Sequence, residues 1–367
     1  MIKQNPAYKI AFIGDSLSGG GAEKVQALLS DYFYDKGWEV QHCIFTDSVS
    51  YHYSGSLVNL GKIHPNSFSL LRKTMRFLAF QKFIKENRFD YIVDFRMRTN
   101  STFEFLNSKF IYPKNVVYRV ESGILDFYFP KSVALSNLIY KEKHFVAVSK
   151  ALQNEIISRK FAENVHCIYN PIDLKRVAVL KNNFEPEFQN YILAVGRIND
   201  NVKQFDQLVK AFSKSILPSK NISLVILGEG KQRKNLVDLA QKLEIADKVI
   251  FKGFVENPFP YYKNALFSVL CSRNEGFPNV LVEALACETP VVAFDCFSGP
   301  SEIIIHKKNG LLVDDQNFQK LTLAMNEMTE NSELYNLCKQ HALTSVAKFS
   351  LENIGAQWLQ YLQNNVS

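Results

Sequence analysis

Short apolar runs that alternate with helical patterns are the feature that most constrains how this chain can fold. In the first half, the apolar run YKIAFIGD is followed by a glycine loop and by the helical pattern AEKVQALLSDYFYDKG, which closes at Gly37. Further strand patterns are WEVQHCIFT, FDYIVDF, NVVYRV and HFVAV, and Ser149 after the last one is placed to cap a helix. Strands that alternate with helices are typical of a parallel, doubly wound sheet. The sequence therefore predicts an α/β fold.

A second series of the same kind starts near residue 190. Its strand patterns are YILAVGRI, ISLVILGEG, KVIFKGFV, ALFSVLCS, PVVAFDC and GLLV, and its helical patterns include QFDQLVKAFSKSI and NVLVEALA. We therefore expect two Rossmann-like domains, at residues 1–175 and 190–349, each of a size that folds as a unit. The polar segment NPIDLKRVAVLKNNFEPEFQN is interpreted as the linker, and TDSVSYHYSGSLVNLGKIHPNSFS as a long surface loop. The last helix, about 350–367, carries Ile354, Trp358 and Leu362 on one face.

Composition limits the class of protein. Hydrophobic residues make up 47% of the chain and charged residues 22%, which is typical of a globular protein with a substantial core. No stretch approaches the roughly 18 consecutive apolar residues of a membrane span, and the opening residues lack the pattern of a secretory signal. The six cysteines form no CxxC pair, so we expect reduced thiols, no metal centre and a cytoplasmic location.

Positive charge is concentrated in the first half. Residues 1–180 contain 24 Lys and Arg against 16 Asp and Glu, a surplus of eight, whereas residues 181–367 contain 19 against 20. A basic half indicates an anionic partner, either phospholipid headgroups or nucleic acid, although ordinary surface lysines produce the same count. The segment LLRKTMRFLAFQKFIKENR intersperses five cations with apolar residues: Arg72, Lys73, Arg76, Lys82 and Lys85.

Glycines and cations follow several of the predicted strands, at the edge where parallel sheets bind ligands. The run SGGGAEKV opens the first helix and would suit a phosphate at its N-terminus, or it is a tight turn. It lacks the GxGxxG register, which argues against a nicotinamide-dependent oxidoreductase. Arg197 and Lys203 in GRINDNVKQF could converge on a diphosphate, or could be solvated surface cations. Gly228 and Gly230 offer a second close approach of backbone to a nucleotide.

Two carboxylates flank a Gly-Phe-Pro turn in the segment NEGFPNVLVEALA. Glu275 lies in a loop, and Glu283 lies about one turn into a helix that is expected to start near Asn279, with Pro278 at its first turn. They are not spaced as a metal pair or as a glycosidase acid and base. Carboxylates that accept hydrogen bonds from sugar hydroxyls fit this arrangement better.

The order of these motifs resembles the family-4 retaining glycosyltransferases of the GT-B fold. The likeness runs from about Lys9 to Val313 through GGAEKV, VSKAL, NPID, VGRI…VKQF, LGEG, GF, EGFPNVLVEALA, TPVVAFDC, GPSEII and NGLLV. Its most specific element is the E-x7-E pair of Glu275 and Glu283. The resemblance implies two Rossmann-like domains that face each other across a cleft, with the last helix returning to the first domain.

The resemblance also implies a role for each candidate residue. Arg197 and Lys203 would neutralise the diphosphate of a UDP-sugar, Glu283 would hold the ribose, and Glu275 would bind the donor sugar. The glycine loop would close over the phosphates, and other backbone and apolar groups would line the sugar and the base. These remaining donor contacts would come from Gly19, Gly20, Gly21, Gly228, Phe254, Val255, Gly276, Phe277, Pro278 and Asn279.

The implied reaction needs no metal and no other cofactor. Fixed cations and helix N–H groups would stabilise the departing nucleotide diphosphate, and the acceptor would attack with retention at the anomeric carbon. Many relatives carry a His in a first-domain loop; here the corresponding stretch, YRVESGIL, has none. Glu121 would take part of that role, and Arg119 could instead bind an acceptor phosphate.

The resemblance extends to the substrates. The segment DCFSGPSEII is similar to that of bacterial enzymes of surface-polysaccharide and lipid-linked oligosaccharide synthesis. It favours UDP-GlcNAc or UDP-GalNAc as donor, with UDP-galactose or UDP-glucose second. The basic first half would suit a saccharide or polyprenyl-diphosphate-linked acceptor and peripheral contact with the inner face of an anionic membrane.

Other classes remain open from sequence alone. A UDP-sugar epimerase has a similar fold but needs acid and base groups with a His, a set that we do not find. A non-catalytic nucleotide-sugar-binding subunit would carry the same donor residues. A nucleic-acid-binding module would fit the basic half, yet no such motif is present, and we expect no nucleic acid partner.

Overall fold

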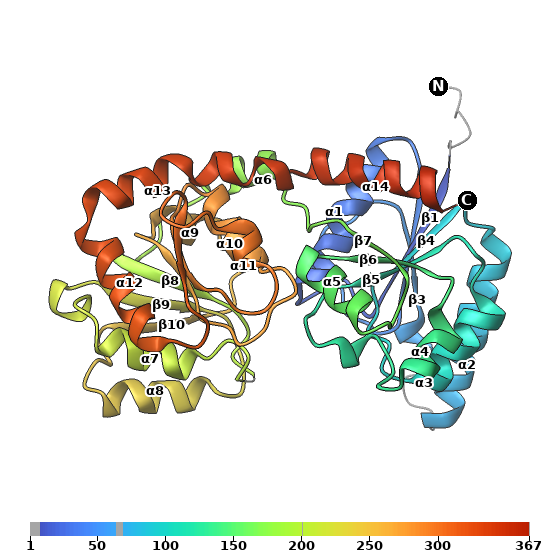
Figure 1. Ribbon diagram of the computed structural model, residues 1–367, viewed down its shortest axis with the longest axis horizontal. Helices are drawn as coiled ribbons and strands as arrows, with labels where there is room; N and C mark the ends of the chain where they lie inside the picture. The colour runs from blue at the N-terminus through green and yellow to red at the C-terminus, as the bar shows by residue number, and fades with distance from the viewer. Residues whose placement is uncertain (1–7, 64–68, 200, 367) are drawn as a thin grey trace. The chain divides into compact units, whose positions relative to one another are not determined.

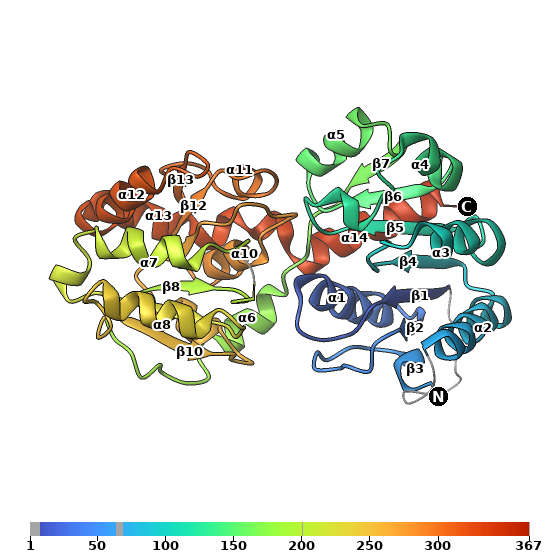
Figure 2. The same ribbon diagram turned by 90° about the horizontal axis from the view of Figure 1, so that it is seen from below.

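The computed structural model describes residues 8–63, 69–199 and 201–366, and the chain forms two compact units. Unit 1 runs through Pro171 and takes in the segment from Leu351 onward, and unit 2 is Ile172–Ser350. Each unit is built around one parallel sheet with helices against it (Figures 1 and 2). The expected α/β fold with two Rossmann-like domains is confirmed, as is the return of the last helix to the first domain.

Unit 1 has a seven-stranded sheet in the order β3-β2-β1-β4-β5-β6-β7. Its elements are β1 (Lys9–Gly14), α1 (Gly21–Asp35), β2 (Glu39–Ile44), β3 (Ser56–Asn59), α2 (Ser69–Asn87), β4 (Tyr91–Asp94), α3 (Ser101–Leu106), β5 (Val116–Val120), α4 (Val133–Tyr140), β6 (His144–Ala147), α5 (Lys150–Ser158), β7 (Asn164–Cys167) and α14 (Leu351–Asn365). A π-helical turn, Asn107–Ile111, follows α3. Ser149 caps α5 as expected, because its Oγ accepts a hydrogen bond from the Leu152 N–H at 3.1 Å.

Unit 2 has a six-stranded sheet in the order β10-β9-β8-β11-β12-β13. Its elements are α6 (Leu174–Leu180), β8 (Tyr191–Val195), α7 (Phe205–Ser213), β9 (Ser223–Leu227), α8 (Arg233–Lys242), β10 (Val249–Gly253), α9 (Phe259–Asn264), β11 (Ser268–Leu270), α10 (Asn279–Ala286), β12 (Val291–Phe294), α11 (Pro300–Ile303), β13 (Gly310–Val313), α12 (Phe318–Glu330) and α13 (Ser332–Ser345). Helices α7 and α8 cover one face of this sheet, and α9 and α10 cover the other (Figures 1 and 2).

The core of each unit explains why its strands are almost entirely apolar. Central strands of a parallel sheet are covered on both faces, so both sets of alternating side chains are buried. In unit 1, α1 and α14 share one core cluster with the sheet, and Ile354, Trp358 and Leu362 of α14 are completely buried there. This confirms the apolar face expected for the last helix.

The strand order fixes where ligand-binding loops meet. In unit 1 the order reverses between β1 and β4, and in unit 2 between β8 and β11. Loops that leave two such strands diverge to opposite faces of the sheet and leave a crevice at its carboxyl edge. The loops after β1 and β4, and those after β8 and β11, are therefore the places to look for a site.

Two expectations about the elements were wrong, and one strand was not expected. The segment expected as a linker contains α6, which is held to unit 2 by the Lys181–Glu288 ion pair at 2.6 Å and by the Asn257 amide on the Leu180 carbonyl at 3.0 Å. The segment expected as a surface loop contributes the edge strand β3, and residues 64–68 of that segment lie outside the described residues. Strand β7 was not expected, because its sequence, NVHC, has too short an apolar run to be noticed.

Candidate functional site

An ion pair lies between the loops that follow β8 and β11 in unit 2. The Nζ of Lys203 is 2.5 Å from Oε1 of Glu275, and the two side chains are 20% and 12% exposed. Arg197, on the same β8 loop, is exposed, and no ion pair or hydrogen bond of its guanidinium is found among the described residues. Two of the four residues predicted to be catalytic are thus in contact, and a third lies on the same loop.

Gln204 holds these two loops together, and no sequence pattern marks it. Its backbone is in the left-handed region (φ 51°) and its side chain is almost completely buried. Its Nε2 donates to the Cys271 carbonyl at 2.8 Å, and its Oε1 accepts from Nε of Arg273 at 2.8 Å. The Arg273 N–H also donates to the Val202 carbonyl at 2.8 Å. Because Gln204 follows Lys203 directly, this clamp sets where the lysine meets Glu275.

The glycines after β9 pack against the β8 loop rather than standing open. A Cβ on Gly228, whose φ is +143°, would lie 1.9 Å from the Gly196 carbonyl oxygen, and a Cβ on Gly230 would lie 2.2 Å from the Ile198 carbonyl carbon. The Gly228 N–H donates to the Gly253 carbonyl at 2.8 Å, directly before Phe254. Phe254 is 67% exposed. Gly228 and Gly230 leave the space that the backbone of the β8 loop occupies, which a side chain at either position would fill. Phe254 and Val255 follow directly after this packed turn.

The segment before α10 is held rigidly. Gly276, Phe277 and Pro278 are buried, Asn279 starts the helix as expected, and the N-cap residue, Pro278, makes no side-chain capping hydrogen bond. Ser298 Oγ donates to the Gly276 carbonyl at 2.6 Å. A Cβ on Gly299 would lie 2.4 Å from Cδ of Pro278, so this loop needs glycine for close approach as well as for its φ of +101°.

Glu283 lies inside unit 2 rather than on the outer surface of its helix. It is 8% exposed, and the Tyr262 hydroxyl donates to its Oε2 at 3.3 Å. Burial, followed by the nearby Glu283 carboxylate, raises the pKa of Tyr262 well above its ordinary value, so the phenol stays a donor. Glu283 is therefore a fixed carboxylate one turn into α10.

The glycine loop of unit 1 opens α1. Gly20 is the N-cap residue, and Gly19 has a φ of +78°, where a Cβ would have no atom of the described residues within 4 Å. A Cβ on Gly20 would lie 2.1 Å from Oε2 of Glu23, and Gly21 is the first residue of the helix. Gly19 thus has a left-handed backbone conformation and Gly20 packs closely against Glu23, and glycine permits both.

Glu121 and Arg119 bind each other instead of projecting freely. The Nε of Arg119 donates to Oε1 of Glu121 at 2.7 Å, and its Nη2 donates to Oδ1 of Asn170 at 2.7 Å. The guanidinium lies 5.1 Å from the ring of Trp358 on α14, and the side chain is completely buried. The hypothesis that Arg119 binds an acceptor phosphate is therefore wrong, because the residue ties β5 to β7 and α14. Glu121, 7% exposed, stays a prediction.

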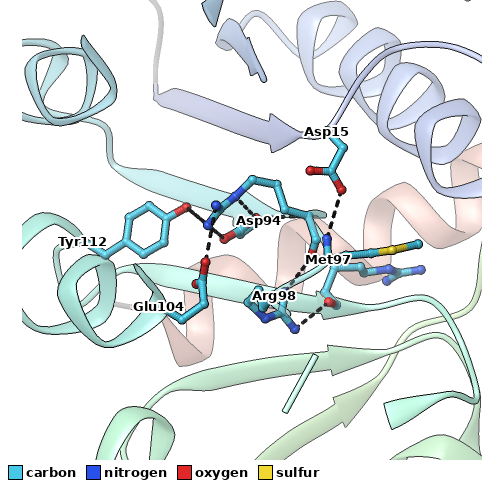
Figure 3. A network of polar contacts seen from close by, with 8 residues as sticks. Asp15, Asp94, Met97, Arg98, Glu104 and Tyr112 are labelled. Atoms are coloured by element: carbon cyan, nitrogen blue, oxygen red, sulfur yellow. Dashed lines mark hydrogen bonds and ion pairs between the residues drawn. The ribbon is translucent and has the colours of Figure 1, made fainter. Parts of the chain in front are cut away.

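A buried charge network at the end of β4 was not predicted from the sequence. Asp94, Glu104 and Tyr112 point toward one another (Figure 3). The guanidinium of Arg96 bridges them: its Nη2 is 2.7 Å from Oδ2 of Asp94, and its Nη1 is 3.4 Å from Oε1 of Glu104. Burial alone would raise the pKa of Asp94, but the charge of Arg96 holds it below its ordinary value, whereas burial raises the pKa of Glu104.

The loop that carries this network is also joined to the end of β1. Asp15, at the end of β1, accepts a hydrogen bond from the Met97 N–H at 3.1 Å (Figure 3). Burial raises the pKa of Asp15, and the Met97 N–H opposes that rise. The only sequence signal for this arrangement was the charged end of the FDYIVDFRMR segment, which is apolar elsewhere.

The cations of α2 do not all face solvent. Arg76 donates through Nη2 to the Gly61 carbonyl at 2.7 Å and through Nη1 to the Phe45 carbonyl at 3.3 Å. Lys73, Lys82 and Lys85 are exposed. The interpretation of five surface cations is therefore wrong for Arg76, which supports the ends of two strands.

Among residues 8–63, 69–199 and 201–366, no three His, Cys, Asp or Glu side chains come together in a way that could hold a metal ion. In the same residues, none of the helices has the length and apolar character that crossing a membrane requires.

Comparison with known proteins adds the family. The chain matches the family described as Glycosyl transferases group 1 over residues 178–344. It is 30% identical, over 95% of this chain and 97% of the relative, to the N-acetylgalactosamine-N,N'-diacetylbacillosaminyl-diphospho-undecaprenol 4-alpha-N-acetylgalactosaminyltransferase of Campylobacter jejuni. It is 27% identical, over 96% and 98%, to a second C. jejuni enzyme, the GalNAc-alpha-(1->4)-GalNAc-alpha-(1->3)-diNAcBac-PP-undecaprenol alpha-1,4-N-acetyl-D-galactosaminyltransferase.

Solved structures show the same fold at lower identity. HepE of Anabaena in complex with UDP superposes with a TM-score of 0.75 at 19% identity, covering 97% of this chain and 99% of that chain. TarM of S. aureus superposes with a TM-score of 0.77 at 14% identity, covering 99% and 100%. These likenesses concern the arrangement of strands and helices.

Proposed function

The chain belongs to the group 1 glycosyltransferases of the GT-B fold, and from that premise we propose that it transfers an N-acetylhexosamine from a UDP-sugar to a lipid-linked saccharide, with retention at the anomeric carbon. The observation that carries the proposal is the Lys203–Glu275 pair with Arg197 on the same loop. These residues supply both the cations for a diphosphate and the carboxylate for a sugar. Unit 2 is therefore proposed as the donor-binding domain and unit 1 as the acceptor-binding domain.

In the absence of donor, Lys203 and Glu275 satisfy each other. The donor's diphosphate carries more negative charge than one carboxylate and competes for Lys203, with Arg197 adding bidentate hydrogen bonds. Glu275 then accepts hydrogen bonds from donor sugar hydroxyls, supported by the backbone of Gly276 to Asn279. Glu283 holds the ribose, and exposed Phe254 with Val255 lies against the uracil.

The chemical step follows from where charge develops. The bond between the anomeric carbon and the phosphate oxygen breaks, and negative charge grows on the departing UDP. Arg197, Lys203 and the first turn of α10 stabilise that charge without reorganising, which lowers the barrier. The acceptor hydroxyl attacks from the face that UDP leaves, and a β-phosphate oxygen takes its proton. In this scheme no metal ion takes part, and the role left for Glu121 is to hold the β5 end in place.

The choice of substrates rests on the relatives. Two relatives that match nearly the whole chain are named as N-acetylgalactosaminyltransferases, and both act on undecaprenol-linked saccharides. We therefore favour UDP-GalNAc over UDP-GlcNAc, UDP-galactose and UDP-glucose as donor, and a polyprenyl-diphosphate-linked saccharide as acceptor. The epimerase alternative is set aside because these relatives are transferases.

A lipid-linked acceptor requires an approach to the membrane, and α2 offers a surface for it. Leu71 and Leu78 are 54% and 55% exposed and lie two turns apart on one face of α2, followed on that face by exposed Lys82 and Lys85. Phe110, on the π-helical turn that contacts α2, is 65% exposed. Apolar side chains beside lysines are suited to docking on an anionic bilayer. Co-sedimentation with anionic vesicles is expected to fall at high salt and in the Lys82→Glu/Lys85→Glu variant. Unchanged binding in both would contradict the docking.

The decisive experiment measures UDP release from a panel of four donors: UDP-GalNAc, UDP-GlcNAc, UDP-galactose and UDP-glucose. Each is offered with and without bacterial lipid extract and EDTA. We expect lipid-dependent release from one donor, unaffected by EDTA and lost in Arg197→Ala and Glu275→Ala. Lys210→Ala is the matched control, since Lys210 is 45% exposed on α7 and pairs with Asp206 at 3.8 Å, one turn away on the same helix. UDP binding without release from any donor would instead favour a non-catalytic nucleotide-sugar-binding subunit.

A further inference from the structure

An open pocket of about 960 Å³ lies at the carboxyl ends of β2 and β3 in unit 1. It is lined by the loop Asp47–Val49, by Tyr53, by Leu57 and Asn59 of β3, and by Lys62. None of these residues was singled out by the sequence, because they fall in the segment interpreted as a featureless surface loop.

The walls of this pocket are fixed by contacts behind it. Asn59, the last residue of β3, donates to Oδ1 of Asp47 at 2.7 Å, which joins the end of β3 to the loop Asp47–Val49. Behind them, Arg76 of α2 holds the carbonyls of Gly61 and Phe45, at the ends of the same two strands. The pocket is therefore preformed, as ligand sites usually are.

The ring of Tyr53 is also held. It meets the imidazole of His42 edge-on, with ring centres 5.0 Å apart, and His42 is completely buried. His42 is fixed in turn by Gln26 at 3.0 Å and by the Ser54 carbonyl at 3.1 Å. A positioned aromatic ring beside Leu57 gives one side of the pocket an apolar, flat surface.

The chemistry of the lining selects a neutral, hydroxyl-rich ligand. Asp47 keeps its second carboxylate oxygen outside the contact with Asn59, so it can accept a hydrogen bond from a hydroxyl or an amide N–H. One carboxylate and one ammonium, Asp47 and Lys62, leave the lining without net charge. Because the lining has no net charge, it offers free phosphate or a diphosphate no net electrostatic attraction, whereas a sugar presents hydroxyls to the polar groups and its C–H face to Tyr53.

The pocket shares its wall with the glycine loop. The Leu17 N–H donates to the Ser48 carbonyl at 3.0 Å, and the Ser50 N–H donates to the Leu17 carbonyl at 3.0 Å. The hydroxyls of Ser18 and Ser48 are 2.7 Å apart. A ligand in the pocket therefore lies next to the loop that we expect over the donor phosphates.

We propose that this pocket binds a sugar unit of the acceptor, set back from the hydroxyl that is glycosylated. The proposal rests on the proposed function, since it identifies where the acceptor of that reaction is held. It makes Asp47 and Tyr53 determinants of which glycan the protein extends.

Kinetics with the full chain test the proposal through two variants. Asp47→Asn keeps an acceptor oxygen for Asn59 but removes the charged partner of the ligand, and Tyr53→Leu removes the ring. Each is expected to raise KM for the acceptor about 10-fold, Asp47→Asn through the loss of a hydrogen bond to a charged group and Tyr53→Leu through the loss of the aromatic surface. Both should leave kcat and KM for the donor unchanged. Asp35→Asn is the control, because Asp35 is exposed at the last residue of α1, far from the carboxyl edge of the sheet. An unchanged KM for the acceptor in both variants would overturn the proposal.

A binding measurement separates this proposal from the proposed function. Saturation-transfer NMR on the full chain uses the methyl glycoside of GalNAc-α-1,4-GalNAc as probe, in the presence of UDP. The signal is expected in the unmodified protein and in Asp35→Asn, and it is expected to disappear in the Asp47→Asn/Tyr53→Leu double variant. If the unmodified protein releases no UDP from any donor, the proposed function fails, and this measurement alone decides the pocket. A signal that persists in the double variant, or is absent from the unmodified protein, counts against the pocket.

Discussion

The two units use charge in opposite ways at the carboxyl edges of their sheets. In unit 1, Asp94, Arg96 and Glu104 are each at most 4% exposed and bind one another. In unit 2, Arg197 is exposed, and the Lys203–Glu275 pair is 20% and 12% exposed. The carboxyl edge of the sheet therefore carries buried, mutually paired charges in unit 1 and partly exposed charges in unit 2.

The difference follows from the energetics of desolvation. A buried ion pair has already lost its water, so removing one partner leaves an uncompensated charge and is strongly destabilising. A partly exposed pair keeps part of its hydration and can exchange one partner for a ligand at a modest free-energy difference. Unit 1 therefore uses its charges to hold loops in place, whereas unit 2 keeps its charges partly hydrated, as the proposed binding of a substrate requires.

The largest effect is expected for Arg96→Ala. Loss of the guanidinium leaves the buried Asp94 carboxylate unpaired, so the free energy of unfolding of unit 1 should fall by about 4 kcal/mol. Tryptophan fluorescence during denaturant unfolding reads unit 1 alone, because both tryptophans of the chain, Trp38 and Trp358, are buried in its core.

Two controls sharpen this result. Lys82→Ala breaks the exposed Lys82–Glu86 pair, 4.0 Å apart, and should change stability by less than about 0.5 kcal/mol. An apolar triple variant, Asp94→Leu/Arg96→Met/Glu104→Leu, should recover most of the lost stability, because no buried charge is left unpaired. A loss in Arg96→Ala no larger than that in Lys82→Ala would show that the network is not what holds unit 1.

Acidification should destabilise unit 1 through His42. Burial lowers the pKa of this imidazole from 6.5 to about 4, partly opposed by its bond to the Ser54 carbonyl. The unfolded chain therefore takes up the proton first, and the stability contributed by the neutral ring is present above pH 6.5 and is lost as the pH falls toward 4. Over that window the loss is roughly 3 kcal/mol.

The measurement is the difference in unfolding free energy between the natural protein and His42→Gln, followed by fluorescence from about pH 7 to about pH 4. Gln cannot titrate, and it can still donate to the Ser54 carbonyl. The difference between the two proteins should therefore shrink on acidification. A difference that stays constant with pH would mean that His42 does not titrate in this way. Asp15, Asp94 and Glu104 have shifted pKa values of their own, but all three are present in both proteins, so their contributions cancel in this difference.

Lys203→Met is the corresponding change in unit 2, and its effect should fall on activity rather than stability. We expect kcat/KM to drop about 100-fold, or about 2.7 kcal/mol of transition-state stabilisation. Thermal unfolding should change little, because the Glu275 carboxylate that loses its partner is still partly hydrated. If Lys203→Met lowered the free energy of unfolding as much as Arg96→Ala does, the proposed difference between the charges of the two units would be contradicted.

Sequence patterns were sufficient for the fold, and they marked Arg197, Lys203 and Glu275, which the structure brings to neighbouring loops. Central parallel strands such as Tyr191–Val195 are apolar on both faces, so they are visible as continuous runs. The edge strand β3 is not, because its residues are only half-buried and its pattern is that of a loop.

Side-chain partners were harder to anticipate than elements. Gln204 and the Arg96 network act through contacts between residues 2 to 69 positions apart, and no local pattern marks them. Arg76 and Arg119 looked like surface or ligand-binding cations, since charge alone does not tell whether a carbonyl or a carboxylate of the same chain lies nearby. The pocket beside β3 was missed for the same reason as the strand itself.

The smallest expected effect separates two uses of glycine. Gly228→Ala introduces a Cβ 1.9 Å from the Gly196 carbonyl oxygen at a φ of +143°, whereas Gly37→Ala introduces one at a φ of +78° with no atom of the described residues within 4 Å. Gly37→Ala should lower the free energy of unfolding by about 1 kcal/mol, from backbone strain alone. Gly228→Ala should lower the free energy of unfolding by about 2 kcal/mol in all, since its conformation is nearly exclusive to glycine and the β8 loop must also move.

The loss of stability in Gly228→Ala is measured by hydrogen exchange of peptides from β8 and β9. Fluorescence cannot report it, because unit 2 contains no tryptophan. UDP affinity should fall together with protection, since the displaced β8 loop carries Arg197 and leads to Lys203. If Gly228→Ala and Gly37→Ala lose the same stability and UDP affinity is unchanged, the backbone contact does not position the donor loops. Lys203 and Glu275 would then be positioned by the Gln204 clamp alone.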